Sequence, residues 1–219
     1  IAWEYHEIAP NEYDFHGKTT PNKNLDKFLT MCEEKGLWVG IRPGPWIYSE
    51  MAGGGLPQRW ASKNITRLDP DFAREAELWV KGVSEALKPH LVTNGGCIIC
   101  LQVDNEVAGL RQEWKVLGGS PDEFGSFPYW MKHERWNGDL AGANKAYGTD
   151  WEDWDEAEPM ISPRTSREVY HFQDCHRFYE WVQTTWIKRV AKWYKEAGID
   201  VPLYLNTTGQ PFPQDPELL

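Results

Sequence analysis

Hydrophobic and polar positions along the chain follow two patterns. Short runs that are apolar without alternation are typical of strands buried on both faces. Such strands are predicted at 1–3, 37–41, 97–103 and 201–205. Segments in which apolar residues recur every three or four positions predict helices at 25–35, 69–87 and 165–197. Because strands and helices alternate, the pattern predicts an α/β fold with a parallel sheet and right-handed crossovers.

The connection over 107–163 interrupts this regular order. It contains turn signals, an acidic patch and weak helical patterns near 129–135 and 140–147. A connection of this length after a strand is typical of a lid or a wall of a binding site. Its tryptophans are candidates for lining such a wall: Trp114, Trp130, Trp136, Trp151 and Trp154. For any single tryptophan, packing in a core is the more common role.

A polar tip follows the apolar run at 97–103. Gln102, Asp104 and Glu106 share one parity, so a straight strand would direct all three side chains the same way. The carboxyl ends of parallel strands are where α/β folds place their chemistry. The competing interpretations are a buried carboxylate in an ion pair and a solvated start of a loop.

Composition excludes several classes of function. The net charge of −10 and the pI near 5.1 argue against nucleic acid as a partner, because phosphate binding requires clustered Lys and Arg. No run of about 18 apolar residues is present, so no membrane span is expected. The 13 tryptophans offer flat faces on which sugar rings stack, although large aromatic residues also fill cores.

Neither cysteines nor histidines form a recognisable metal or redox pattern. The pair Cys97 and Cys100 has redox spacing, but two residues three apart on a strand face opposite sides. We interpret all four cysteines as small apolar residues. His171 and His176 do not share one helical stripe, and the glycine run 53–55 lacks the lysine of a phosphate loop. We therefore expect no metal and no cofactor.

Three ordered blocks carry a resemblance to a known family. They are Trp3-Glu-Tyr-His-Glu-Ile8 with Tyr13-Asp-Phe-His-Gly17, Ile41-Arg-Pro-Gly-Pro-Trp-Ile-Tyr-Ser-Glu50 with Gly54-Gly-Leu-Pro57, and Asn94-Gly-Gly-Cys-Ile-Ile-Cys-Leu-Gln-Val-Asp-Asn-Glu106. Together they resemble the signatures of glycoside hydrolase family 35, the retaining β-galactosidases. After Glu106, Trp136-Asn-Gly138 and Ala146-Tyr-Gly-Thr-Asp-Trp151 are more similar to the family 42 β-galactosidases.

The resemblance implies a (β/α)8 barrel and assigns roles to particular residues. It implies that Glu106 is the general acid/base and that Asn105 hydrogen-bonds the 2-hydroxyl of the sugar. It also implies that Glu50 accepts hydrogen bonds from the ring hydroxyls of galactose, with Tyr48 and Ser49 beside it. A salt bridge to a neighbouring arginine is the alternative for Glu50.

Four departures from the family pattern leave the substrate open. Glu4 replaces Asn, Tyr48 replaces a small or polar residue, Cys97 replaces Pro and Asp104 replaces Glu. A terminal β-galactoside is the expected carbohydrate substrate, with β-glucoside and β-glucosaminide as alternatives. A catalytically inactive sugar-binding barrel is the alternative from another class of protein. We expect His6 and Glu7 to brace the barrel rather than to touch the sugar.

The resemblance also predicts the extent of the domain. Residues 1–219 correspond to a single partial barrel, from the second to the fifth strand, with 107–163 as an insertion after the fourth. The family's nucleophile is a glutamate at the tip of the seventh strand, so it would lie outside this chain. Such a piece is expected to be inactive alone. Its compartment is unknown, and an oligomer is compatible with the sequence.

Overall fold

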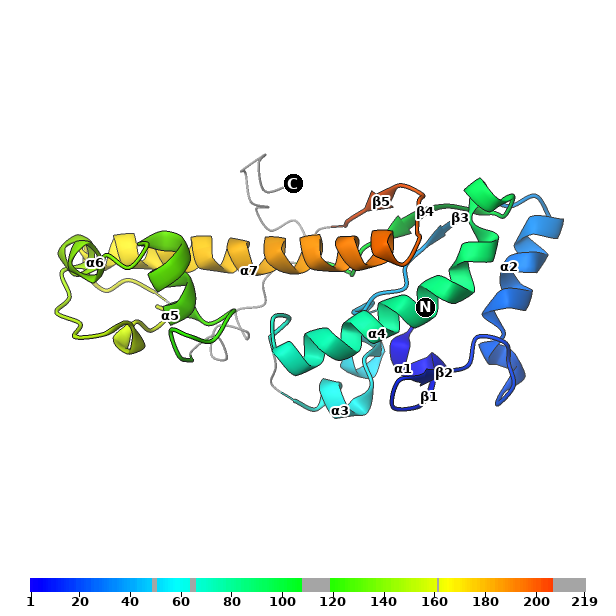
Figure 1. Ribbon diagram of the computed structural model, residues 1–219, viewed down its shortest axis with the longest axis horizontal. Coiled ribbons are helices and arrows are strands. Elements are labelled where there is room, and N and C mark those ends of the chain that lie inside the picture. The colour runs from blue at the N-terminus through cyan, green and yellow to red at the C-terminus, as the bar shows by residue number, and fades with distance from the viewer. Residues whose placement is uncertain (49–50, 64–65, 108–118, 161, 207–219) are drawn as a thin grey trace. The chain divides into compact units, whose positions relative to one another are not determined.

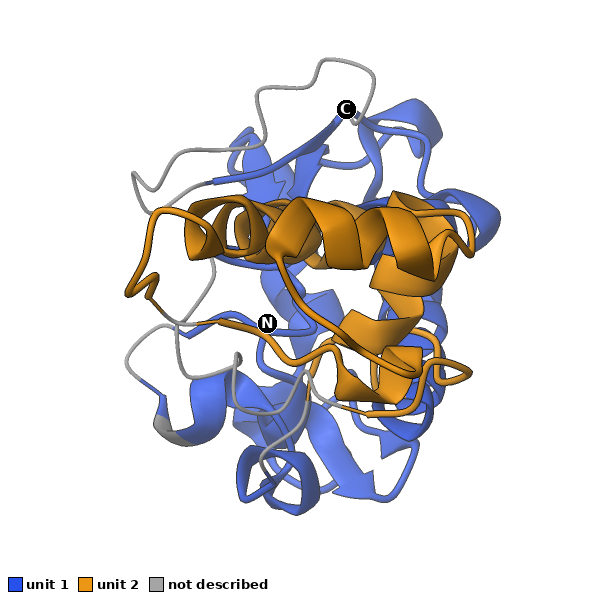
Figure 2. Ribbon diagram, turned by 90° about the vertical axis from the view of Figure 1, so that its left-hand side faces the viewer, with its two compact units in different colours: residues 1–63, 70–108, 186–210 blue, residues 64–69, 109–185, 211–219 orange. Residues whose placement is uncertain are grey.

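The computed structural model describes residues 1–48, 51–63, 66–107, 119–160 and 162–206. The chain divides into two compact units (Figure 2). Unit 1 consists of Ile1–Lys63, Pro70–Ala108 and Trp186–Gln210, and unit 2 consists of Asn64–Asp69, Gly109–Thr185 and Pro211–Leu219. The predicted insertion at 107–163 therefore belongs almost entirely to unit 2, and the polar strand tip belongs to unit 1.

Unit 1 contains the predicted parallel sheet. Its strands are β3 (Val39–Ile41), β4 (Ile98–Gln102) and β5 (Leu203–Tyr204), and they lie side by side in the order β3-β4-β5 (Figure 1). Both pairings are parallel. Since all three strands run in one direction, their carboxyl ends meet at one edge of the sheet. The described residues form this open three-stranded sheet, and they do not close a barrel.

The strand predicted at 1–3 is wrong. The segment Trp3–His6 forms a single helical turn, α1, and it leads into an antiparallel hairpin of β1 (Glu7–Ala9) and β2 (Glu12–Tyr13). The turn places the Trp3 indole in the core, fully buried and stacked on Trp79 at 5.9 Å between ring centroids. An apolar triplet alone did not distinguish a strand from a helical turn.

Helices α2 (Leu25–Glu34) and α4 (Pro70–Leu87) confirm two predicted elements of unit 1. Asn24 caps α2 through a hydrogen bond from the Lys27 amide to its side-chain oxygen, at 2.8 Å. The apolar stripe of α4 is almost completely buried. It consists of Phe72, Ala73, Ala76, Trp79, Val80, Val83 and Leu87.

The third predicted helix, α7 (Glu168–Glu196), is one continuous helix of 29 residues. Trp186, Val190 and Tyr194 from its last part are fully buried in unit 1. The remaining elements of unit 1 are short. They are η1 (Pro21–Lys23), η2 (Ala52–Gly55), α3 (Gln58–Ala61), η3 (Lys88–His90) and η4 (Val92–Asn94).

Unit 2 packs short helical elements against the first part of α7. The elements are α5 (Phe127–Trp130), the π-helical turn Met131–Arg135, α6 (Leu140–Tyr147) and η7 (Trp154–Glu156). Trp130 and Trp154 are each only 5% exposed, so these two tryptophans fill the core of the unit. Trp114 lies outside the described residues.

The cysteines are all free thiols. Cys32, Cys97 and Cys175 are buried, as interpreted from the sequence, whereas Cys100 is only partly buried. Burial raises the pKa of the Cys175 thiol to about 12, which keeps the thiol protonated and therefore unreactive as a nucleophile. No described helix has the length and apolar character needed to cross a membrane.

Candidate active site

The polar tip of β4 turns sharply away from the strand direction. Asp104 and Glu106 both have left-handed backbone conformations, with φ of 56° and 45°. Non-glycine residues adopt this region rarely and at a cost of about 1 kcal/mol or more, so tertiary contacts must hold the turn. The prediction that the side chains of Gln102, Asp104 and Glu106 point the same way is therefore wrong. The alternation of a straight strand ends before Asp104.

Asp104 is completely buried, and it accepts hydrogen bonds from three separate segments. Its Oδ1 accepts from the Trp46 amide at 3.0 Å and from the Asn105 amide at 2.8 Å. Its Oδ2 accepts from the indole N–H of Trp186 on α7. The carboxylate thus ties the loop after β3, the turn after β4 and helix α7 together within unit 1.

Asn105 is 3% exposed, and its side-chain oxygen is the centre of a second network. The Oδ1 atom accepts from Arg42 Nη1 at 2.8 Å, from Gln102 Nε2 at 3.0 Å and from Asn206 Nδ2 at 3.0 Å. Arg42 follows β3, Gln102 ends β4 and Asn206 follows β5. The carboxyl ends of all three parallel strands therefore contribute a donor to one oxygen.

The backbone of Glu106 is held by a hydrogen bond, whereas its carboxyl group has no partner among the described residues. Its amide donates to Asn206 Oδ1 at 3.0 Å. The residue is partly buried, and its carboxyl group makes no hydrogen bond or ion pair with any other residue that the structure describes. A fixed main chain with an unengaged carboxyl group suits a residue that exchanges protons with a ligand.

The predicted sugar-binding residues of the loop after β3 are only partly described. Tyr48 is partly buried, with φ of 52°, and its amide donates to the Gly54 carbonyl at 3.2 Å. Ser49 and Glu50 lie outside the described residues. The roles that the resemblance implies for these three residues stay predictions.

Sequence reasoning gave no role to Arg42, Asn206 or Trp186. The sequence did contain a signal for Asn206. This residue follows a predicted strand, and the carboxyl end of that strand must lie at the same edge of the sheet as the carboxyl end of β4. The sequence contained no such signal for Trp186, because a tryptophan in the apolar stripe of a helix is equally compatible with ordinary packing. Its hydrogen bond to Asp104 joins residues 82 positions apart.

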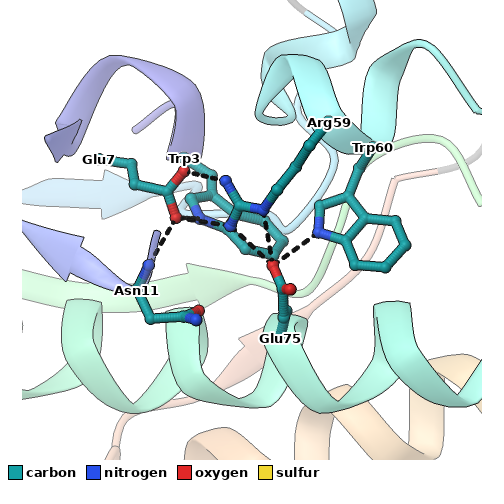
Figure 3. A network of polar contacts seen from close by, with 6 residues as sticks. All are labelled: Trp3, Glu7, Asn11, Arg59, Trp60 and Glu75. Carbon is teal, nitrogen blue, oxygen red and sulfur yellow. Dashed lines mark hydrogen bonds and ion pairs between the residues drawn. The ribbon is translucent and has the colours of Figure 1, made fainter. Parts of the chain in front are cut away.

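A separate polar cluster in unit 1 surrounds Arg59 (Figure 3). The guanidinium donates two hydrogen bonds to Glu7 and two to Glu75, at up to 2.9 Å. The Trp3 indole donates to Glu7 at 3.2 Å, and the Trp60 indole donates to Glu75 at 2.8 Å. These contacts join α1, β1, α3 and α4, so Glu7 makes structural contacts within unit 1.

Ionisation in this region follows from burial and from these contacts. Burial alone would raise the pKa of Glu7, but hydrogen bonds from Arg59 and from the Asn11 amide outweigh it and lower the pKa. The same pairing with Glu7 raises the pKa of Arg59. Burial lowers the pKa of His6, whose Nδ1 lies 2.8 Å from the Asp14 carbonyl oxygen. His6 is therefore a neutral structural group at neutral pH.

Unit 2 has a cavity of about 500 Å³ at the start of α7. Trp151 contributes to its wall, so one of the five tryptophans proposed for the insertion does line a hollow. The other charged or aromatic wall residues are Glu156, Glu158, Arg164, Glu168 and His171. Neither here nor elsewhere in the described residues do three metal-binding side chains cluster.

A parallel sheet that gathers a carboxyl group and amides at the carboxyl ends of its strands has the arrangement of the α/β enzymes. Comparison with known families defines the class further. The family described as glycosyl hydrolases family 35 matches residues 1–117, and the chain belongs to this family.

Three known proteins show how far the similarity extends. The exo-β-D-glucosaminidase of Pyrococcus horikoshii is 28% identical over 94% of this chain and 29% of its own length. The β-galactosidase of Bos taurus is 37% identical over 48% of this chain and 16% of its own length. The crystal structure of the β-galactosidase from Bacillus circulans sp. alkalophilus matches 94% of this chain and 31% of its own, with 18% identity and a TM-score of 0.64. The chain thus spans less than a third of each of these proteins.

Proposed function

We propose that this chain is part of a retaining exo-β-glycosidase that hydrolyses terminal non-reducing β-glycosides, with β-galactosides as the favoured substrates. Glu106 is the general acid/base. The observation that carries this proposal is the state of Glu106, whose backbone is held by Asn206 while its carboxyl group has no partner among the described residues. Family membership supports the same reaction class.

The proposed reaction needs two carboxyl groups about 5–5.5 Å apart. In the first step Glu106 gives its proton to the glycosidic oxygen as the bond to the anomeric carbon breaks and a second carboxylate bonds to that carbon. In the second step Glu106 takes a proton from water, whose oxygen displaces the enzyme carboxylate. We propose that the second carboxylate belongs to a later strand of a complete (β/α)8 barrel, beyond residue 219.

The other predicted site residues have binding roles in this proposal. Asn105 hydrogen-bonds the 2-position of the sugar. Glu50 accepts from ring hydroxyls, and Tyr48 and Ser49 shape the pocket beside it. Tyr48 lies in the same loop as Trp46, whose amide is anchored to Asp104, so the two loops that would hold the sugar are tied together.

Substitution of Glu106 by Gln in the full-length protein tests the acid role. A poor leaving group such as an alkyl alcohol needs protonation, and an activated phenol does not. We expect kcat/KM for an alkyl β-galactoside to fall about 10³-fold or more and for a dinitrophenyl β-galactoside to fall much less, in the range of general acid catalysis. Glu12→Gln, at an exposed hairpin position, is the matched control.

Two outcomes would contradict the proposal. Equal losses on both leaving groups would remove the acid role from Glu106. A wild-type full-length protein that binds β-galactosides without cleaving any β-glycoside would instead be a sugar-binding barrel.

A further inference from the structure

The wall of the cavity in unit 2 contains several polar side-chain groups that have no partner in the described part of the chain. The Trp151 indole N–H, the Glu158 carboxylate and the Arg164 guanidinium make no hydrogen bond or ion pair with the residues that the structure describes. A fourth wall residue, His171, has an unpartnered ring nitrogen, Nε2. The indole and the guanidinium can only donate, and the carboxylate can only accept.

His171 adds a buried acceptor to this wall. The residue is 7% exposed, and its ring donates to the Glu158 carbonyl oxygen. Because Nε2 is the nitrogen without a partner, the donor is Nδ1. Burial lowers the pKa of His171, so the ring is neutral at neutral pH and Nε2 carries no proton. A buried acceptor without a donor costs free energy, and a ligand that donates to Nε2 recovers it.

Trp151 lies next to this acceptor. Its ring meets that of His171 edge-on, with 5.6 Å between centroids and an interplanar angle of 78°. Trp130 and Trp154 are each only 5% exposed, whereas Trp151 is partly exposed and belongs to the cavity wall. Its indole therefore offers apolar surface that the core does not use. A sugar ring can stack its C–H groups on such a surface and direct its hydroxyls to polar groups beside it.

The charges of the wall favour a neutral ligand. The carboxylates of Glu156 and Glu168 already accept hydrogen bonds from backbone amides, at 2.7 Å and 3.1 Å. The unpaired charges that remain, on Glu158 and Arg164, have opposite signs, so one of them opposes an anion and the other opposes a cation. A hydroxyl both donates and accepts, so a polyhydroxy ligand satisfies both. The volume of about 500 Å³ lies within the range of ~300–1,000 Å³ for small-molecule sites.

We propose that the cavity of unit 2 is a second carbohydrate-binding site, which holds a neutral sugar against Trp151 with one hydroxyl donating to His171 Nε2. The inference goes beyond the proposed function, because binding here breaks no bond. The two sites share no residue: the cavity wall belongs to unit 2, and the turn with Glu106 belongs to unit 1.

Met160 lines the same cavity and supplies a local probe of its occupancy. The full-length protein is labelled at its methionine methyl groups, and the Met160 resonance is identified by its absence in Met160→Leu. Spectra are recorded with Glu106→Gln, so that added disaccharides stay intact. We expect lactose and cellobiose to shift the Met160 resonance saturably, and inorganic phosphate and spermidine to leave it in place.

Substitutions in the wall connect this shift to the proposed contacts. Trp151→Ala removes the stacking surface, and we expect the dissociation constant of the disaccharide to rise about 10-fold. Trp38→Ala removes a tryptophan of unit 1 that is 67% exposed, and it should leave the constant unchanged. Arg164→Met removes a donor and should weaken binding about 10-fold. Arg167→Met, at an exposed position outside the wall, is its matched control.

Two substitutions of His171 separate ligand binding from packing. Asparagine keeps a donor at the place of Nδ1 and has no atom at the place of Nε2. Glutamine keeps a polar atom at the place of Nε2 and loses the donor to the Glu158 carbonyl. We expect His171→Asn to weaken disaccharide binding about 10-fold and His171→Gln to retain most of it. The opposite ranking would give His171 a purely structural role and would overturn its part in binding.

The outcomes are distinguishable from those that test the proposed function. If no disaccharide shifts the Met160 resonance, or if the shift persists unchanged in Trp151→Ala and His171→Asn, the second site is refuted. A saturable shift with phosphate or spermidine alone would refute its assignment to a neutral sugar. Loss of β-glycoside cleavage bears on Glu106 only, since a protein without that activity can still show the shift at Met160.

Discussion

The indole N–H of Trp186 donates to the fully buried carboxylate of Asp104. This contact joins helix α7 to the turn that carries Asn105 and Glu106. A buried carboxylate without partners would cost several kcal/mol, so its donors are necessary for the turn to exist. The geometry of the candidate acid therefore depends on a tryptophan of α7 that lies 82 positions after Asp104 in the sequence.

Asp104→Asn is expected to destabilise the protein. Oδ1 accepts from two amides and Oδ2 accepts from Trp186, so an amide nitrogen at either place would face a donor. We expect the free energy of unfolding to fall by about 2–3 kcal/mol, the cost of leaving buried donors unsatisfied. Urea denaturation of the full-length protein measures it.

Trp186→Phe separates the hydrogen bond from the packing. Phenylalanine keeps a ring against Phe72, whose centroid lies 5.6 Å from that of Trp186, but it cannot donate to Asp104. Val190→Ala, also fully buried on α7, is the control for packing loss alone. If the two variants were equally stable but only Trp186→Phe lost activity, the bond would be shown to position the site. Equal activities of Trp186→Phe and Val190→Ala would show that the hydrogen bond does not position the site.

The Arg59 cluster makes a different prediction. Removing Arg59 leaves Glu7, whose side chain is 8% exposed, as an unpaired carboxylate. We expect Arg59→Met to cost about 2–3 kcal/mol, less than a fully buried pair because the Arg59 side chain is 29% exposed. Chemical denaturation with Arg74→Met, an exposed pair with Asp71, as the control measures the difference.

A compensating variant tests whether the loss comes from unpaired charge. In the triple variant Glu7→Gln, Arg59→Met and Glu75→Gln, the glutamine oxygens still accept from the indoles of Trp3 and Trp60. Stability should return to within about 1 kcal/mol of the wild type. If the triple variant stayed as unstable as Arg59→Met, lost packing of the arginine stem would be the cause instead.

The periodic pattern of the sequence located elements whose burial is regular. The stripes of α4 and α7 and the apolar run of β4 are long enough to define their period, and they were found within a few residues. The three-residue segment at Trp3 was too short for its period to be read. The parallel order followed from the alternation of strands and helices, because parallel strands need crossovers.

Candidate site residues could be proposed from the sequence only where a motif and the tip of a predicted strand coincide. Asn105 and Glu106 stand at the end of a recognisable buried run, and the resemblance covers them. The left-handed turn at Asp104 was not predictable, because contacts of its side chain come from Trp46 and from an indole on α7, which no local pattern connects to it. Asn206 was missed although its place after a predicted strand was a signal, because its particular partners depend on β5 lying beside β4.

His6 makes stability depend on pH in a known direction. Burial lowers its pKa below the ordinary 6.5, so the unfolded chain binds a proton that the folded chain does not. Stability from this group is complete above pH 6.5 and is lost as pH falls below that value toward the folded pKa. We expect the urea midpoint of the wild type to fall between pH 7 and pH 5 more steeply than that of His6→Gln. His16→Gln, at an exposed position, should follow the wild type.

Gly95 and Gly96, two adjacent glycines before β4, allow the cost of backbone strain to be compared with the cost of steric overlap. Gly95 has φ of 87° and open space around it, so Gly95→Ala should cost about 1 kcal/mol of backbone strain. A Cβ on Gly96 would lie 2.2 Å from the His90 carbonyl carbon and oxygen. Because those are backbone atoms, no rotamer change relieves the overlap, and Gly96→Ala should cost about 3 kcal/mol or more. Similar urea midpoints for the two variants would contradict the close approach that sets where β4 begins.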